Sequence, residues 1–249
     1  MKELVELFLR LIPPFPDILV AAAVSAAAIL ASGLLSGTLK RRAGWKTGYT
    51  RKLFHFLIFF TAVGLHLWRG MPAVNILGLG MGIYVVLIVL AGAGNFFFEA
   101  LGREKDSPRR GFFIVLPYLT TAAGGLLANW LFGACAVMGY LVGGAADAAA
   151  EPVGVRFGRH RYKVTSLRKV ATAERSVEGS LSVFLVSLLL SAAFFTLYYH
   201  LPVGRSIVGA VLLSAAVALV EALSPHGADN LTIQVAASGL ASLFIRMWG

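Results

Sequence analysis

Three carboxylates at the edges of apolar segments have the spacing that most directly suggests chemistry. Asp147 and Glu151 lie four residues apart among Ala, Gly and Val, and Glu178 lies just before another apolar segment. On a helix, residues at i and i+4 share one face. An ionised side chain inside an apolar span costs roughly 2.5–3.5 kcal/mol, so it normally faces a polar cavity or a partner. We therefore expect Asp147 and Glu151 to line a polar cavity.

The stretch between these acids, 154–180, carries seven Arg or Lys residues. Gly154 and Gly158 permit close approach of the backbone to phosphates. The cations that could neutralise a triphosphate are Arg159, Arg161 and Lys163. Because Mg²⁺ binds carboxylate oxygens together with phosphate oxygens, acids beside a basic loop indicate a nucleotide with a divalent cation. The alternative reading is a solvated loop that only fixes membrane topology.

A histidine follows two basic residues at the start of another apolar segment, in Arg51-Lys52-Leu53-Phe54-His55. His55, about one turn inside, could contact phosphate or help to deprotonate an alcohol. Arg51 and Lys52 are equally consistent with positive charges that anchor a helix end. We interpret Asn95, Glu99 and the run 107–111 as loop structure.

Two further acids, Glu221 and Asp229, lie like Glu178 near the ends of apolar segments. Glu178 and Asp229 near helix N-termini are favoured by the helix macrodipole whatever their function. Glu221 ends an apolar segment and has no basic neighbour in its own loop. A carboxylate in that position needs a partner. We expect this partner in the basic stretch 154–180.

The composition is that of a membrane protein. Hydrophobic residues make up 58% of the 249 residues and charged residues 14%, whereas a soluble domain has roughly 25% charged residues. The sequence therefore predicts an all-α, polytopic membrane bundle that forms a single domain over residues 1–249. Segments long enough to cross a bilayer, about eight transmembrane helices, are expected at 18–39, 53–68, 73–93, 112–132, 134–153, 181–200, 206–222 and 231–247.

The distribution of positive charge predicts the orientation of these helices. If the N-terminus lies outside, the cytoplasmic loops hold 17 of the 22 Lys and Arg residues. These loops are 40–52, 94–111, 154–180 and 223–230. Topology then explains the net charge of +10, and we expect no nucleic-acid partner. Residues 1–15 predict a short interfacial helix, because apolar and charged residues alternate there at helical spacing before a proline-rich stop.

Four short blocks of polar sequence are spread over most of the chain. They are Arg51-Lys52-x-x-His55, Asp147-Ala-Ala-Ala-Glu151-Pro-Val-Gly154 with Phe157-Gly158-Arg159-His160-Arg161-Tyr162, Arg175-Ser176-Val177-Glu178-Gly179-Ser180, and Glu221 followed by Asp229-Asn230-Leu231-Thr232. In this order they resemble the polyprenol kinase family of integral membrane CTP-dependent lipid kinases. That family includes dolichol kinase, phytol kinase and the yeast-type diacylglycerol kinase, and it is distantly similar to the phosphatidate cytidylyltransferases.

The resemblance implies a cytoplasmic active site that transfers the γ-phosphate of CTP, with Mg²⁺, to a membrane alcohol. The acceptor would be an isoprenoid alcohol such as phytol, geranylgeraniol or dolichol, or a diacylglycerol. The predicted catalytic residues are Asp147, Glu178, His55 and Asp229. The predicted metal ligands are Asp147, Glu151, Glu178 and Asp229, with Glu221 as a further polar residue. The predicted nucleotide-binding residues are Arg51, Lys52, Gly154, Gly158, Arg159, His160, Arg161, Lys163, Arg175, Ser176, Gly179, Ser180 and Asn230.

Two departures and two alternatives accompany this interpretation. Ala146 stands where the family commonly has Gly, and Arg175 where Lys is common. Phosphatidate cytidylyltransferases usually end with Asp-Arg-x-Asp where this chain has the run 229–232, which favours the kinase over a CDP-lipid synthase. The alternative of another class is a small ion-coupled transporter with Asp147, Glu151 and Glu221 as a cation path. The sequence leaves open which alcohol is used and whether the chain forms a homo-oligomer.

Overall fold

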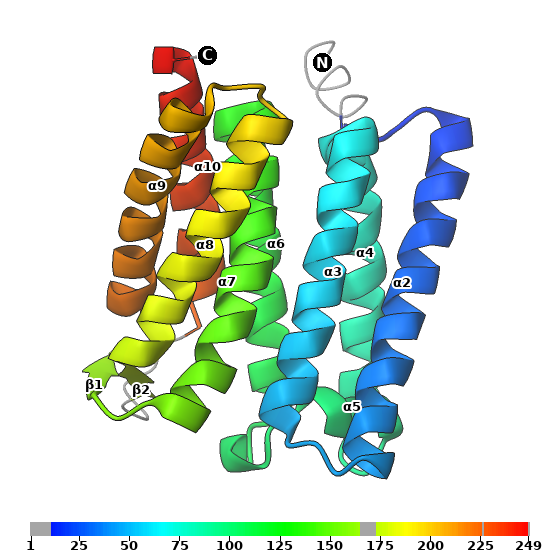
Figure 1. Cartoon of the computed structure of the whole chain (residues 1–249). Helices are drawn as coiled ribbons and strands as arrows, with labels where there is room; N and C mark the ends of the chain where they lie inside the picture. The colour runs from blue at the N-terminus through cyan, green and yellow to red at the C-terminus, as the bar shows by residue number, and fades with distance from the viewer. Residues whose placement is uncertain (1–10, 165–172, 226, 249) are drawn as a thin grey trace. The chain divides into compact units, whose positions relative to one another are not determined.

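The computed structural model of the chain describes residues 11–164, 173–225 and 227–248. Within them the chain forms eight helices of 20 residues or more, one six-residue helix and a two-stranded sheet (Figure 1). The predicted all-α polytopic membrane bundle is confirmed. The helices are α2 (Phe15–Arg42), α3 (Thr47–Arg69), α4 (Met71–Ala91), α5 (Phe96–Leu101), α6 (Phe112–Phe132), α7 (Ala136–Phe157), α8 (Val177–Leu197), α9 (Val203–Leu223) and α10 (Asp229–Trp248).

Each of the eight predicted membrane segments overlaps one long helix. By length and hydropathy, six helical stretches are long and apolar enough to cross a membrane. One of them, Phe112–Phe157, joins α6 and α7 through a short 3-10 turn, and α3 is not among the six. The number of spans therefore stays a prediction. The predicted interfacial helix over 1–15 falls mostly outside the described residues.

The chain divides into two compact units, Met1–Tyr118 and Leu119–Gly249. In the first unit, α5 packs its aromatic side chains against α2 and α4. Tyr84 stacks on Phe54, with ring centroids 5.5 Å apart, and meets Phe97 edge-on at 5.9 Å. A Cβ at Gly37 of α2 would overlap the ring of Phe96. That glycine therefore lets the short helix lie close to α2. Whether the two units act as a single domain stays a prediction.

In the second unit, α7 is buried on all sides over most of its length, from Ala136 to Asp147. It packs against α8 and α10, and α9 packs against both of these. The contacts between these helices are rich in buried serines. Lipid offers no hydrophobic gain for bringing helices together, so small residues that allow close approach of backbones favour such packing. The buried serines are Ser187 and Ser191 of α8, Ser206 and Ser214 of α9, and Ser238 and Ser242 of α10.

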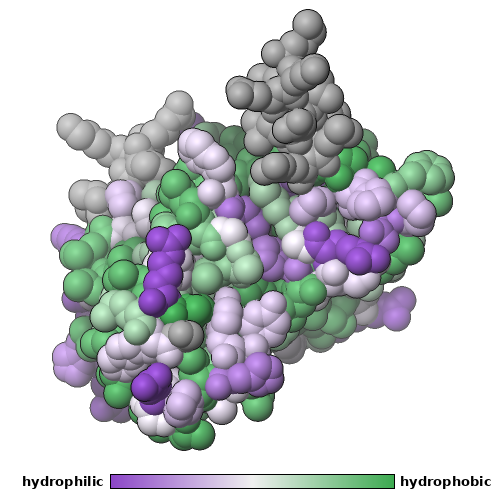
Figure 2. Space-filling view, turned by 90° about the horizontal axis from the view of Figure 1, so that it is seen from above, coloured by the Kyte–Doolittle hydropathy of each residue, from purple (hydrophilic) through white to green (hydrophobic). Residues whose placement is uncertain are grey.

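The helix ends carry charges in the order that the helix macrodipole favours. Helix α2 has Asp17 in its first turn and three basic residues, 40–42, in its last. Asp17 pairs with Arg69, at the end of α3, over 2.8 Å. Figure 2 shows one face of the molecule, on which hydrophilic residues lie between hydrophobic ones.

Candidate active site

Asp147 and Glu151 lie one turn apart on α7, as the sequence predicts. Asp147 is only 7% exposed, and Glu151 is half-buried. The next residue, Pro152, lies inside the helix. A proline has no N–H, so it cannot donate to the carbonyl oxygen of Ala148 four residues earlier. The same stretch of helix thus carries two carboxylates and a carbonyl that lacks its usual helical donor, and Mg²⁺ prefers oxygen ligands of these kinds.

The basic loop predicted over 154–180 is shorter than expected. Helix α7 continues into it as far as Phe157, and α8 begins at Val177. A helix can continue past the edge of the apolar region, because charged side chains are well solvated in water. The first charged residue after an apolar segment therefore does not mark the end of the helix. Between the helices, β1 (Arg161–Val164) and β2 (Ala173–Ser176) pair as an antiparallel hairpin. Part of the predicted loop, 165–172, lies outside the described residues.

The two faces of this hairpin differ in character. Tyr162 and Arg175 are cross-strand partners, so their side chains project from the same face, which we call the inner face. Side chains alternate along a strand, so Arg161, Lys163 and Glu174 project from the opposite, outer face. Arg161, Lys163 and Glu174 are exposed, and the Arg161 guanidinium lies 3.5 Å from the Glu174 carboxylate. Ser176, which pairs with Arg161 and so lies on the same face, is buried. The alternation of charged and less polar residues over 161–164 is typical of a strand, but four residues are too few to distinguish it from a charged loop.

Arg175 links the hairpin to the ends of two helices. Its Nε lies 3.1 Å from Glu221 Oε1 on α9, and its Nη2 lies 3.0 Å from Asp229 Oδ2 on α10. The side chains of Arg175, Glu221 and Asp229 are 11%, 7% and 16% exposed, so solvent screens these ion pairs little. The expectation that Glu221 finds its partner within 154–180 is confirmed. Nucleotide binding by Arg175 stays a prediction.

The hydroxyl groups of Ser180 and Tyr162 extend the network that the two ion pairs form. Ser180 Oγ donates to Glu221 Oε2 at 3.0 Å and lies 2.7 Å from the Tyr162 hydroxyl. A serine hydroxyl has one hydrogen, so Tyr162 is the donor to Ser180. Burial raises the pKa of the Tyr162 hydroxyl. The chain Tyr162–Ser180–Glu221–Arg175–Asp229, which we call the hairpin lock, joins β1, α8, α9, β2 and α10.

The first turn of α8 binds the chain that leads into β1. Ser176 is the N-cap, and its Oγ accepts a hydrogen bond from the Gly179 amide at 3.1 Å. Glu178 accepts a hydrogen bond from the His160 amide at 3.2 Å and lies 2.9 Å from the His160 Nδ1. Glu178 therefore has a local structural role. Its predicted catalytic and metal-binding roles, and nucleotide binding by His160, Ser176, Gly179 and Ser180, stay predictions.

Glycines allow α7 and α8 to approach each other around Ser176. A Cβ at Gly154 would lie 2.9 Å from Ser176 Oγ, and a Cβ at Gly158 would lie 2.8 Å from Ser176 Cβ. Either distance is too short for ordinary contact, so both positions require glycine. The sequence indicated close approach of phosphate at these glycines, whereas the structure shows close approach of a serine. Phosphate contact there stays a prediction.

The remaining predicted residues are divided between the units. Arg51, Lys52 and His55 are partly buried on the first two turns of α3, in the first unit, and the His55 ring lies 4.4 Å from the Phe59 ring. In the second unit, Arg159 is exposed. Asn230 is buried at the start of α10, where its carbonyl oxygen accepts a hydrogen bond from Gln234. The functional roles of all of these stay predictions.

In the part of the chain that the structure describes, the carboxylates do not form a large metal cluster. Among the described residues, no group of three or more His, Cys, Asp or Glu side chains is arranged to hold a metal ion. Mg²⁺ is often held by only one or two carboxylates together with substrate phosphates and water. Asp147 and Glu151 fit that requirement. Glu178 and Asp229, the other predicted ligands, already contact His160 and Arg175.

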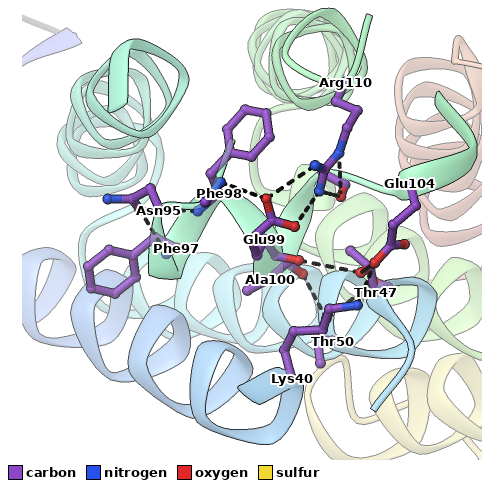
Figure 3. A network of polar contacts seen from close by, with 12 residues as sticks. Lys40, Thr47, Thr50, Asn95, Phe97, Phe98, Glu99, Ala100, Glu104 and Arg110 are labelled. Carbon is purple, nitrogen blue, oxygen red and sulfur yellow. Dashed lines mark hydrogen bonds and ion pairs between the residues drawn. The ribbon is translucent and has the colours of Figure 1, made fainter. Parts of the chain in front are cut away.

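A second polar network, in the first unit, joins α5 to the segment before α6 (Figure 3). Glu99 accepts hydrogen bonds from Arg110, at 2.6 Å from Nη2 to Oε2 and at 3.1 Å from Nη1 to Oε1. The hydrogen bonds from Arg110 lower the pKa of Glu99. Asn95 caps α5 by accepting from the Phe97 amide at 2.9 Å. Asn95 is thus the N-cap of α5 and Glu99 lies within that helix, so the interpretation of Glu99 as loop structure is wrong, although both residues make structural contacts.

The same network also ties α2 and α3 to this segment. Lys40 Nζ lies 2.6 Å from Glu104 Oε1, and Thr47 Oγ1 donates to the same oxygen at 3.1 Å. The hydrogen bond from Lys40 lowers the pKa of Glu104 to about 2. Thr50 Oγ1 donates to the Ala100 carbonyl oxygen at 2.7 Å. Sequence reasoning did not single out Lys40, Thr47 or Glu104, because each finds its partner only after folding.

Comparison with known proteins gives one relative. A phytol kinase of Synechocystis sp. (strain ATCC 27184 / PCC 6803 / Kazusa) is 34% identical to the chain over 113 residues. The matched region covers 45% of this chain and 46% of the phytol kinase, so it spans a little under half of that relative. No protein-family model matches the chain, and no solved structure matches it. The similarity agrees with the resemblance to the polyprenol and lipid kinases.

Proposed function

We propose that the chain is a CTP-dependent lipid-alcohol kinase. It transfers the γ-phosphate of CTP to a membrane alcohol, which is an isoprenoid alcohol of the phytol, geranylgeraniol or dolichol type or a diacylglycerol. The observation that carries the proposal is the 34% identity to a phytol kinase. The site supports it, because the second unit places the buried Asp147 on the same α7 that leads into an exposed basic hairpin face.

Phosphoryl transfer asks a protein mainly to position its substrates and to neutralise charge. Arg159, Arg161 and Lys163, all exposed, would bind the phosphates of CTP. The alcohol oxygen forms a bond to the γ-phosphorus, the bond from that phosphorus to the β–γ bridging oxygen breaks, and CDP leaves. The alcohol proton passes to a carboxylate. We place this chemistry on Asp147, which could serve as the base or as a metal ligand.

Charge neutralisation would be shared with a divalent cation. Asp147 and Glu151 would hold Mg²⁺ together with phosphate oxygens, and the ion would stabilise the charge on the transferring phosphoryl group. The end of α7 that carries these two acids leads into the stretch 154–180, which is rich in Lys and Arg. By the positive-inside rule, the proposed site faces the cytoplasm. The acceptor would enter from the bilayer and need reach only the depth of the helix ends.

The test uses purified protein in nanodiscs with Mg²⁺, CTP labelled on the α or the γ phosphate, and a panel of lipid alcohols and phosphatidate. Label passing from the γ position into lipid, with CDP formed, is the expected result, and the best acceptor names the substrate. Label passing from the α position, with pyrophosphate released, would make the chain a CDP-lipid synthase. Absence of transfer to every acceptor would favour the transporter.

A further inference from the structure

The basic residues of the hairpin lie in two different surroundings. Arg175, on the inner face, has a side chain that is 11% exposed and engages two carboxylates. Arg161, on the outer face, has a side chain that is 59% exposed, and Lys163 beside it is also exposed. A nucleotide that arrives from solvent meets the outer face without any rearrangement of the hairpin. It reaches Arg175 only by competing with Glu221 and Asp229.

We propose that the hairpin divides two tasks between its faces. Arg175 and Tyr162 on the inner face anchor the hairpin to α8, α9 and α10, and Arg161 and Lys163 on the outer face bind the nucleotide phosphates. Arg175 is then a positioning residue and not a phosphate ligand, in contrast to the role that the family resemblance implies. The binding half of this proposal rests on the proposed function, whereas the anchoring half stands without it.

The charge balance of the hairpin lock favours this division. Arg175 is the cation paired with both Glu221 and Asp229, and Asp147 also lies within electrostatic range of Glu221. If Arg175 turned to a phosphate, it would leave two largely buried carboxylates without their cation, which is strongly unfavourable. The third guanidinium nitrogen, Nη1, is buried and makes no hydrogen bond within the described residues. A phosphate placed at Nη1 would be repelled by the neighbouring carboxylates.

Tyr162 gives the anchor a second point of attachment on the other strand. Its hydroxyl donates to Ser180 Oγ, which in turn donates to Glu221 Oε2. The carboxylate of Glu221 is therefore held from β2 through one oxygen and from β1 through the other. Of these cross-strand neighbours, Arg175 binds the carboxylate directly and Tyr162 binds it through Ser180, and together they fix the position of the hairpin. The outer face is thereby presented to solvent in one orientation.

The test measures two properties of the full chain in nanodiscs, amide hydrogen exchange of β1 and β2 and equilibrium binding of CTP. Both are compared between the original chain and four variants. The first variant, Arg175→Met, leaves Glu221 and Asp229 charged and without their cation. The second, Arg175→Met/Glu221→Gln/Asp229→Asn, removes those charges as well. The third, Arg161→Gln/Lys163→Gln, changes only the outer face. Tyr162→Phe removes a single hydroxyl, and it tests the anchoring role in place of Arg175→Met if that variant does not fold.

We expect Arg175→Met to speed exchange of the strand amides about ten-fold or more, because the lock holds the hairpin against local opening. The triple variant lacks both ion pairs but leaves no uncompensated charge, so its exchange should be faster than that of the original chain and slower than that of Arg175→Met. Tyr162→Phe should speed exchange about three-fold. The outer-face variant should leave exchange unchanged and weaken CTP binding about ten-fold.

The proposal is overturned if Arg175→Met or Tyr162→Phe leaves exchange unchanged, or if the triple variant exchanges as slowly as the original chain. It is also overturned if the outer-face variant binds CTP as tightly as the original chain. Failure of the proposed function looks different. In that case the original chain binds no CTP and transfers no phosphate, while the exchange measurements still decide whether Arg175 and Tyr162 anchor the hairpin.

Discussion

Glu99 and Arg110 are joined by two hydrogen bonds between the two oxygens of the carboxylate and two nitrogens of the guanidinium. Both side chains are largely buried, with Arg110 16% and Glu99 23% exposed. Such paired contacts between a guanidinium and a carboxylate are stronger than single ones. The pair fixes α5 to the segment that leads into α6, and it makes the first unit sensitive to a single residue.

Arg110→Met should therefore destabilise the protein by about 1–3 kcal/mol, because it leaves the Glu99 carboxylate without its donor. The measurement is thermal unfolding in a fixed detergent. Arg109→Met is the matched control, since Arg109 is the adjacent basic residue and is exposed. Equal melting temperatures for the two variants would contradict a structural role for the Glu99–Arg110 pair.

The first unit should lose stability in acid. Lys40 lowers the pKa of Glu104 to about 2, and Arg110 lowers that of Glu99. An unfolded Glu titrates near pH 4.3, so the stability from these pairs is present above about pH 4.3 and is lost as the pH falls toward 2. Melting temperatures measured between pH 6 and pH 3 should fall less steeply for Glu104→Gln than for the original chain. Parallel curves would show that Glu104 contributes nothing.

Gly158 should tolerate no side chain. A Cβ there would meet the Gly154 carbonyl oxygen and lie 2.8 Å from Ser176 Cβ, so α7 and α8 would be forced apart. We expect Gly158→Ala to destabilise the second unit by about 1–3 kcal/mol. Gly204→Ala on α9 is the control, because nothing lies within 4 Å of its Cβ position and alanine favours a helix. A Gly158→Ala variant that melts as high as the control would disprove the close packing.

Asp147 should be indispensable for turnover if the proposed function holds. Asp147→Asn keeps the shape of the side chain but removes its charge, and we expect kcat to fall by about 100-fold or more. The KM for CTP should change less, because Arg159, Arg161 and Lys163 would also bind the phosphates. Asp17→Asn is the control, since Asp17 lies in the first turn of α2 and pairs with Arg69, the last residue of α3. Full turnover by Asp147→Asn would remove Asp147 from the mechanism.

The sequence was sufficient for the helices and for one contact of the site. Long apolar segments identify membrane helices because the bilayer demands length and hydropathy, both of which are local properties. The partner of Glu221 was also predictable, because a carboxylate at the end of an apolar helix requires a cation and 154–180 is rich in them. Which of its seven basic residues would fill that role was not predictable. The register of the hairpin determines that Arg175 is the residue that pairs with Glu221. A count of charges along the sequence does not reveal this register.

Other features depend on contacts between residues that are far apart in sequence. The strands β1 and β2 have only four residues each, too few for a periodicity that stands out from a charged loop. Gly158 lies between Phe157 and Arg159 in the sequence, and only the folded chain shows that Ser176 fills the space beside it. The contact between Lys40 and Glu104 likewise arises because α2 and the segment after α5 end side by side.

The hairpin lock also has a consequence for biosynthesis. Arg175 precedes Asp229 by 54 residues, so at about 5–20 residues per second the ribosome reaches Asp229 some seconds after Arg175. Until α9 has been made, Arg175 has neither of its carboxylates, and until α10 begins it lacks Asp229. The lock is complete only after the last of these helices is threaded into the bilayer. A nascent chain stalled between α9 and α10 would therefore carry most of its helices but no assembled lock.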